Sequence, residues 1–280
     1  MELIRKKGID IPVVQRYGEM EYLQYPALAE TGVVEHLFTT RLGGISEGYL
    51  GTMNVSYSRG DVKENVDENF RRVATILNGS FSDFVFTQQT HTDNIRIVTE
   101  EDRGKGTANV LDYSDIDGIL TNQKGLILSA FFADCVPLFF IDPAKKVIGL
   151  AHSGWKGTVL SIGAKMVDKM VTEFGCDKED IITAIGPSIC QDCYEISADV
   201  AEQFIKAYPD WEKDILIHKG NGKYQLDLWK CNALILEKAG IAKERIHCTN
   251  LCTCCNPAYL FSHRASKGMR GNLGAFLKLK

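Results

Sequence analysis

Residues 129–158 read SAFFADCVPLFFIDPAKKVIGLAHSGWKGT, and the predicted fold is organised around this stretch. Apolar runs in it and just before it predict consecutive strands at residues 126–132, 136–142 and 147–151. The dipeptide Asp142-Pro143 marks the turn between the second and the third run. The stretch therefore predicts a rigid sheet on which a functional site can be built.

Two side chains with soft ligand atoms stand at the ends of these strands. Cys135 follows the first run and His152 follows the last. Directly after His152, apolar residues at helical spacing predict one amphipathic helix from Ser153 to Phe174, with Gly175 as the stop. A thiol and an imidazole beside the start of a helix indicate a polar pocket, which we interpret as the active site.

Helices and strands alternate along the rest of the chain. Further strands are expected within residues 12–25, 33–40, 84–89, 180–184 and 247–253, and further helices at residues 62–78, 199–208 and 226–239. Residues 272–280 alternate only weakly and predict an edge strand. The pattern predicts an α/β protein with a mixed β-sheet flanked by helices. We expect one compact domain of residues 1–280, in which roughly the first 30 residues are peripheral.

The composition sets limits on partners and compartment. The 280 residues are 45% apolar and 24% charged, with a formal net charge of −4 and no basic block, which argues against binding to nucleic acid. No apolar run approaches the ~18 residues of a membrane span, and the charged N-terminus lacks the apolar region of a signal peptide. We expect a cytoplasmic protein that binds neither nucleic acid nor membranes, as a monomer or small homo-oligomer.

Nine cysteines are a high count. Because nine is odd, they cannot all pair, and free thiols or metal ligation are favoured over a disulfide framework. One group could form a closed structural zinc site: Cys190, Cys193, Cys252, Cys254 and Cys255. The spacing of the last three is irregular for a zinc ribbon, so the sequence favours free thiols and leaves a disulfide or a second metal site open.

His91 adds a third soft ligand to the candidate site. It follows the expected strand at residues 84–89 and lies among hydrogen-bonding side chains. With Cys135 and His152 it would leave a tetrahedral zinc ion one open position, as in catalytic zinc sites. A lone histidine is more often structural, and the long spacing of these three residues is not diagnostic by itself.

Several motifs together resemble the YlmD/YfiH family, long labelled polyphenol oxidase or laccase-like. The motifs that carry the resemblance are Phe38-Thr39-Thr40-Arg41-x-Gly43-Gly44-x-Ser46 with Asn54, Gln88-Gln89-x-His91, Ala133-Asp134-Cys135-x-Pro137, Ala151-His152-Ser153-Gly154-Trp155-Lys156-Gly157 and Gly186-Pro187-x-Ile189. Near the C-terminus the family's usual Phe-Ser-Tyr-Arg-Arg is here Phe261-Ser262-His263-Arg264. One arginine of the family pattern is therefore missing, and Arg270 is its candidate substitute.

The resemblance implies that His91, Cys135 and His152 ligate one zinc ion per chain. It also implies phosphorolysis of adenosine, inosine, guanosine and methylthioadenosine, together with deamination of adenosine. Purine nucleosides and inorganic phosphate would then be the substrates. The residues assigned to catalysis are Cys135, His152, Asp134 and Asp117, and those assigned to substrate binding are Arg41, Asn54, Gln89, Lys156 and Arg264.

The expected mechanism follows from the chemistry of the two reactions. Phosphorolysis needs an anion site, and the start of the predicted helix offers free N–H groups, with Lys156, Arg41 and Arg264 as candidate cations. The leaving purine needs a nearby acid, for which Asp117 and Asp134 are the candidates. Deamination needs a water molecule that zinc makes more acidic.

Other classes of function stay open at this point. A multicopper oxidase would need histidine-rich sites, and the six histidines here include no His-x-His pair. Cys135 and His152 could instead be nucleophile and base of a cysteine hydrolase or amidase acting on cell-wall precursors. A partner-binding protein with a structural zinc ion is the non-enzymatic alternative.

Overall fold

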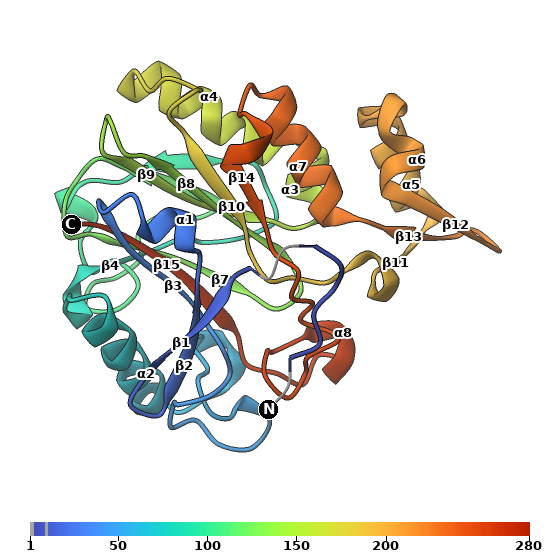
Figure 1. Cartoon of the computed structure of the whole chain (residues 1–280). Coiled ribbons are helices and arrows are strands. Elements are labelled where there is room, and N and C mark those ends of the chain that lie inside the picture. Colours follow the sequence, from blue (N-terminus) through green and yellow to red (C-terminus); the bar gives the residue numbers. More distant parts are fainter. Residues whose placement is uncertain (1–2, 9–10) are drawn as a thin grey trace.

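The computed structural model describes residues 3–8 and 11–280, which form two six-stranded β-sheets, a small three-stranded sheet and flanking helices (Figure 1). The first sheet is ordered β1 (Val13–Tyr17), β2 (Met20–Gln24), β3 (Val34–Thr39), β15 (Leu273–Leu279), β7 (Ile127–Phe132) and β4 (Phe84–Phe86). The second is ordered β14 (Ile246–Cys248), β10 (Ile182–Ile185), β8 (Val136–Asp142), β9 (Val147–Ser153), β6 (Gly118–Thr121) and β5 (Ile95–Ile97). The third comprises β11 (Glu195–Ser197), β13 (Lys223–Leu226) and β12 (Leu216–Gly220).

Both large sheets are mixed, because β4–β7 in the first and β5–β6 and β10–β14 in the second are parallel pairs among antiparallel ones. The α-helices are α1 (Pro26–Ala29), α2 (Lys63–Ile76), α3 (Trp155–Val159), α4 (Ile162–Phe174), α5 (Ala198–Ala207), α6 (Glu212–Ile215), α7 (Leu228–Lys238) and α8 (His263–Ser266). The predicted mixed α/β class is confirmed, although the single expected sheet is in fact two.

The two large sheets pack face to face between layers of helices. In Figure 1, α4 and α7 lie over β8, β9 and β10, while α2 lies on the far side of the first sheet. The core between α2 and the first sheet contains Phe70 and Phe276, and the core between α4, α7 and the second sheet contains Met166 and Leu236. A third core fills the space between the sheets. The order of layers is therefore helix, sheet, sheet, helix.

The central strands β8 and β9 explain why residues 129–158 dominate the sequence pattern. Leu138 and Phe140 of β8 face the helices, while Phe139 and Ile141 face the other sheet. Every residue of β8 and β9 is buried. Strands covered on both faces are apolar at nearly every position, which is the pattern that predicted them.

Two expectations about secondary structure were wrong. Residues 273–279 do not form an edge strand, because β15 lies between β3 and β7 and pairs with both. The helix expected from Ser153 to Phe174 is divided into α3 and α4 at Ser161, which has a φ of 59°. The hydroxyl of Tyr208 donates a hydrogen bond to the Thr158 carbonyl at 2.6 Å. In a continuous helix this carbonyl would accept the N–H group four residues later. The bond from Tyr208 therefore favours the division.

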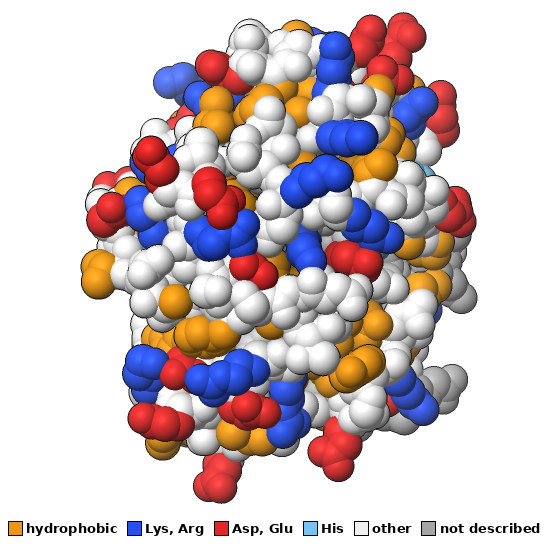
Figure 2. All heavy atoms as spheres, turned by 90° about the vertical axis from the view of Figure 1, so that its left-hand side faces the viewer, with side chains coloured by type: hydrophobic (Ala, Val, Ile, Leu, Met, Phe, Trp, Pro, Cys, Tyr) orange, Lys and Arg blue, Asp and Glu red, His pale blue; other side chains and the backbone are white. Residues whose placement is uncertain are grey.

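The surface in Figure 2 shows acidic and basic side chains lying side by side on one face of the molecule. Mixed charges of this kind do not point to a polyanionic partner. Within the part of the chain that the structure describes, no helix combines the length and apolar character needed to cross a membrane.

Candidate active site

Three segments bring the soft ligands together. The antiparallel register of β8 and β9 pairs Pro137 with His152, so Cys135, just before β8, lies beside the end of β9. His91 comes from the loop that leads from β4 of the first sheet to β5 of the second. His91 Nε2 lies 3.8 Å from Cys135 Sγ, and ligand atoms of the three residues all lie within 4.8 Å of one another. The structure therefore gathers the predicted ligands at one point.

Asp117 holds His152 and His91 in place through hydrogen bonds. It is fully buried, and its Oδ1 accepts a hydrogen bond from His152 Nδ1 at 2.7 Å. The backbone N–H groups of Thr90, His91 and Thr92 donate to the same carboxylate at 2.9, 3.2 and 3.0 Å. Burial opposes the charge of Asp117, but the bonds from His152 and the backbone hold its pKa below the ordinary value. A carboxylate on one imidazole nitrogen leaves the other free for a metal ion.

The thiol and the imidazole stabilise each other's charge. Burial favours the neutral thiol, but His152 and His91 outweigh burial and lower the pKa of Cys135 to about 6. Burial also disfavours an imidazolium, yet Cys135 and Asp117 raise the pKa of His152 to about 9. Cys135 is thus held as a thiolate, the form that binds metal ions and attacks electrophiles.

Gly154 leaves the space that a metal ion requires here. A Cβ atom at this position would lie 2.8 Å from His91 Cδ2, 3.2 Å from Cys135 Sγ and 3.4 Å from His152 Cε1. A larger side chain would therefore crowd all three residues. One thiolate and two imidazoles, one of them oriented by a carboxylate, fit a zinc ion with an open fourth position.

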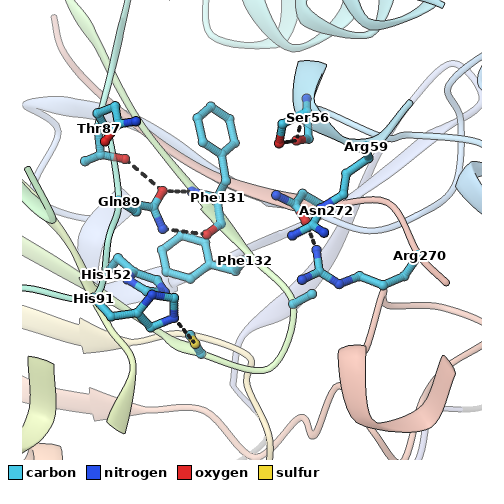
Figure 3. A pocket seen from close by; sticks show the side chains of 14 residues that line it. Ser56, Arg59, Thr87, Gln89, His91, Phe131, Phe132, His152, Arg270 and Asn272 are labelled. Atoms are coloured by element: carbon cyan, nitrogen blue, oxygen red, sulfur yellow. Dashed lines mark hydrogen bonds between the residues drawn. The ribbon is translucent and has the colours of Figure 1, made fainter. Parts of the chain in front are cut away.

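A cavity of about 290 Å³ opens in front of these three residues (Figure 3). In Figure 3, His91 and His152 lie on one side of it, and Arg59 and Arg270 lie on the opposite side. The rings of the β7 phenylalanines and several hydroxyl groups complete its walls: Phe131, Phe132, Ser56, Ser58 and Thr87. Its volume is near the lower end of the roughly 300–1,000 Å³ typical of small-molecule sites, so it suits a small ligand rather than a polymer.

The two arginines present unused hydrogen-bond donors. Nε of Arg59 and Nε of Arg270 are buried and have no hydrogen-bond partner within the described residues. Arg270 also contacts the Oδ1 atom of Asn272 through its Nη1 group. Burial, and then the charge of Arg59, lower the pKa of Arg270 to about 10. Two neighbouring guanidinium groups with unused donors favour an anionic group in the cavity.

The cations predicted for an anion site do not line this cavity. The Arg41 guanidinium donates to two backbone carbonyls and lies 4.7 Å from the centre of the Phe261 ring. The Arg264 guanidinium donates to backbone carbonyls at 3.1 and 3.0 Å. Lys156 is exposed and lies over the ring of Trp155. The helix start expected to hold the anion belongs to α3, which is only 5 residues long.

The two predicted acids also lie outside the cavity wall. Asp117 is buried behind His152, as described above. The carboxylate of Asp134 accepts hydrogen bonds from Thr253 Oγ1 at 2.6 Å and from the Arg264 N–H group at 2.7 Å. Their carboxylates are thus occupied in holding the structure, which corrects the expectation that one of them protonates the ligand.

Asn54 and Gln89 shape the cavity through the backbone. Gln89 lines the cavity, but its amide pairs with the N–H and carbonyl groups of Phe131 at 2.7 and 2.8 Å. Asn54 is fully buried, and its Oδ1 accepts the N–H group of Asn272 at 3.0 Å. Asn54 thereby joins the loop before Arg59 to the segment after Arg270, and it does not line the cavity itself.

Arg59 was not among the residues predicted from the sequence. It ends a short 3₁₀ turn at Tyr57–Arg59, whereas Arg270 lies just before β15, so the two are far apart in the chain. No periodicity marks either residue. Arg270 was expected only as a substitute for an arginine missing from the family pattern.

A second group of thiols lies outside the cavity. Sγ atoms of Cys190, Cys193, Cys252 and Cys255 lie within 4.8 Å of one another, a geometry that could hold a metal ion. Among the described residues, this group and the His91 group are the sets of three or more metal-binding side chains that come this close.

The fold and the site define a mixed α/β protein with a histidine–cysteine–histidine centre beside an arginine-lined cavity. The sequence model described as "Multi-copper polyphenol oxidoreductase laccase" matches residues 35–280. The chain belongs to this family, which is the YlmD/YfiH family that its motifs resemble.

Similar proteins cover nearly the whole chain. Purine nucleoside phosphorylase YlmD of Bacillus subtilis (strain 168) is 38% identical over 244 residues, or 87% of this chain and 87% of that protein. The crystal structure of Bacillus licheniformis hypothetical protein YfiH has a TM-score of 0.89 at 35% identity, over 95% of this chain and 99% of that chain. That of YlmD from Geobacillus stearothermophilus has a TM-score of 0.88 at 33% identity, over 96% and 100%.

Proposed function

We propose that this chain is a zinc-dependent purine nucleoside phosphorylase, acting on adenosine, inosine, guanosine and methylthioadenosine, that also deaminates adenosine. The observation that carries the proposal is the cavity, which is lined by a candidate zinc ligand set and by two arginines whose Nε atoms have no hydrogen-bond partner. A purine nucleoside would bind beside the zinc ligand set, and a phosphate ion would bind to the two arginines. The relatives named purine nucleoside phosphorylase support the reaction class.

The phosphate site is assigned to Arg59 and Arg270. Their buried donors match the oxygens of a phosphate ion, and an anion between them would relieve the repulsion of two close cations. In the reaction, a phosphate oxygen bonds to C1′ of the ribose while the bond from C1′ to the purine breaks, and its electron pair leaves with the purine. Holding the phosphate in line with that bond is the contribution of the arginines.

His91, Cys135 and His152 would hold the zinc ion. The ion would supply Lewis-acid chemistry, polarising a purine substituent and activating water at neutral pH. Asp117 contributes by keeping His152 and the loop of His91 in place, since it bonds the imidazole and three consecutive backbone N–H groups. Phe131, which is half-buried and lines the cavity, supplies apolar surface against which a purine or a ribose can pack.

Product analysis with and without phosphate tests this function. With adenosine and phosphate the protein should release adenine and ribose 1-phosphate, together with inosine from deamination. Without phosphate the adenine should disappear and the inosine should persist, because only phosphorolysis consumes phosphate. A zinc-replete sample that forms neither adenine nor inosine would contradict the proposal.

Substitution of the arginines tests the assignment of the phosphate site. Arg270→Ala and Arg59→Ala should each lower phosphorolysis by at least about tenfold at fixed phosphate, the cost of one charged hydrogen bond, and should lower deamination less. Lys206→Ala is the matched control, since this exposed cation on α5 lies outside the cavity, and both activities should stay at the wild-type level. Equal loss of both activities in the arginine variants would contradict the assignment of these residues to the phosphate site.

A cysteine hydrolase is the second candidate, because Cys135, His152 and Asp117 are arranged as nucleophile, base and orienting carboxylate. Such an enzyme would keep its activity after zinc removal and would form an acyl thioester on Cys135, visible in the mass of the intact protein. The phosphorylase proposal expects the opposite, with loss of activity on chelation and recovery on addition of zinc.

A further inference from the structure

Four cysteines meet beside the second sheet. Cys190 and Cys193 follow β10, while Cys252 and Cys255 follow β14. These strands are parallel neighbours, and a bridge between Ser188 and Cys252 continues their pairing beyond the strand ends. The two loops therefore leave the sheet side by side and carry their thiols to the same place.

Each loop contributes a Cys-x-x-Cys pair that spans a tight turn. The Cys193 N–H group donates to the Cys190 carbonyl at 3.1 Å, and the Cys255 N–H group donates to Cys252 Sγ at 3.4 Å. The N–H group of Cys190 reaches the same sulfur from the neighbouring loop at 3.3 Å. The run at residues 252–255 is thus a regular pair plus Cys254, which stays outside the cluster. Two such pairs are the usual ligands of structural zinc sites.

The spacing of the sulfur atoms fits a single ion. All four lie within 4.8 Å of one another, and those of Cys193 and Cys255 are 3.5 Å apart. A tetrahedral zinc ion with zinc–sulfur bonds of about 2.3 Å requires sulfur–sulfur separations of about 3.8 Å. A disulfide requires about 2.05 Å. The Cys193–Cys255 separation is therefore close to the tetrahedral value, and all four sulfur atoms are near enough to bind one ion.

We propose that Cys190, Cys193, Cys252 and Cys255 bind one structural zinc ion. Four protein ligands complete the tetrahedron, so this site has no open position for a substrate, unlike the set of three at the cavity. Cys190 and Cys252 are buried and the other two are half-buried, which shields the ion from solvent. The proposal concerns residues apart from the cavity and does not depend on the reaction that occurs there.

The ion would stabilise the turn that carries Cys135. Thr253, inside the second pair, donates to Asp134 Oδ1 at 2.6 Å, and the N–H group of Ile189, next to Cys190, donates to the Asp134 carbonyl at 3.0 Å. Asp134 directly precedes Cys135 and has a φ of 89°, a conformation that residues other than glycine adopt only when their surroundings hold them. Both loops that hold this turn would be joined by the metal.

Zinc content of purified variants tests the proposal. Protein prepared without added metal should contain about two zinc ions per chain if the cavity site is also filled, and Cys193→Ser and Cys255→Ser should each remove about one. Both residues are half-buried, so serine should be tolerated. Cys254→Ser is the matched control, because it changes a thiol of the same loop outside the cluster and should keep the wild-type zinc content.

His91→Ala separates the two sites. This variant should lose the cavity zinc and keep about one ion per chain, so failure of the proposed function leaves this result untouched. Cobalt(II) bound to His91→Ala protein should show the intense thiolate-to-cobalt absorption of a sulfur-rich tetrahedral site, and Cys193→Ser should abolish it. In folded wild-type protein, a mercurial reagent should release this zinc as it modifies the four cysteines. Unchanged zinc in both serine variants, iron in place of zinc, or a metal-free His91→Ala protein would overturn the proposal.

Discussion

Asp117 shows how one buried residue can organise a site without entering it. Its two oxygens bond the His152 imidazole and the backbone N–H groups of residues 90–92, so it positions two ligands at once. The cost of burying its charge is offset by these bonds, which keep the carboxylate ionised. At the scale of single residues, the positions of His91 and His152 therefore depend on a side chain that lies outside the cavity wall.

Asp117→Asn should weaken zinc binding at the cavity by about 10–100-fold, because an amide cannot accept from His152 and three N–H groups together. Competition with a chelator in the Cys193→Ser background measures this site alone. Asp115→Asn is the matched control, since the carboxylate of this exposed neighbour accepts from Thr90 Oγ1, a bond that an amide oxygen can also accept. Equal zinc affinities of the two variants would show that Asp117 does not position the ligands.

At the scale of elements, β3 carries a buried titratable group. His36 is 1% exposed, and its Nε2 accepts the N–H group of Tyr25 at 2.9 Å. Burial, and then the charge of Lys280, lower the pKa of His36 from 6.5 to about 4. Between these pH values the unfolded chain binds a proton that the folded chain does not. The free energy of unfolding therefore falls as pH falls through this window and is fully retained above pH 6.5.

His36→Gln should remove this part of the pH dependence, because glutamine keeps an acceptor for Tyr25 but does not titrate. Between pH 7 and pH 4.5 the wild-type protein should lose about 2–3 kcal/mol more unfolding free energy than the variant, measured by denaturant unfolding. His218→Gln on the exposed strand β12 is the control and should follow the wild type. Parallel pH profiles of wild type and His36→Gln would contradict the expected role of burial.

At the scale of the whole molecule, buried strands could be predicted from the sequence, whereas contacts between distant loops could not. The strands β8 and β9 were predicted with bounds close to the observed ones, because both faces are buried and nearly every residue is apolar. His91, Cys135 and His152 were predicted to share a site because each lies at or beyond the end of an apolar run and within a motif that resembles the family. Arg59 was not predicted, and Arg270 was expected only as a substitute for a family arginine, because both belong to loops that meet only after both sheets have assembled.

The misread C-terminal strand has a similar explanation. The sequence of β15 alternates weakly, which suggested an edge, but both of its faces are buried. Ala275 and Leu277 face the core between the sheets, while Phe276 faces the core under α2. Gly274 is needed for close packing, since a Cβ atom there would lie 2.3 Å from the Phe276 ring. Weak alternation thus reflected burial on both faces rather than exposure.

Deleting residues 273–280 should therefore abolish folding, because it removes a strand that pairs on both sides and contributes to two cores. Circular dichroism should show no cooperative thermal transition. Deleting residues 1–17, which include the edge strand β1, is the matched control, and that protein should still unfold cooperatively at a lower temperature. A cooperative transition in the C-terminal deletion would mean that β3 and β7 hold the first sheet together without the strand between them.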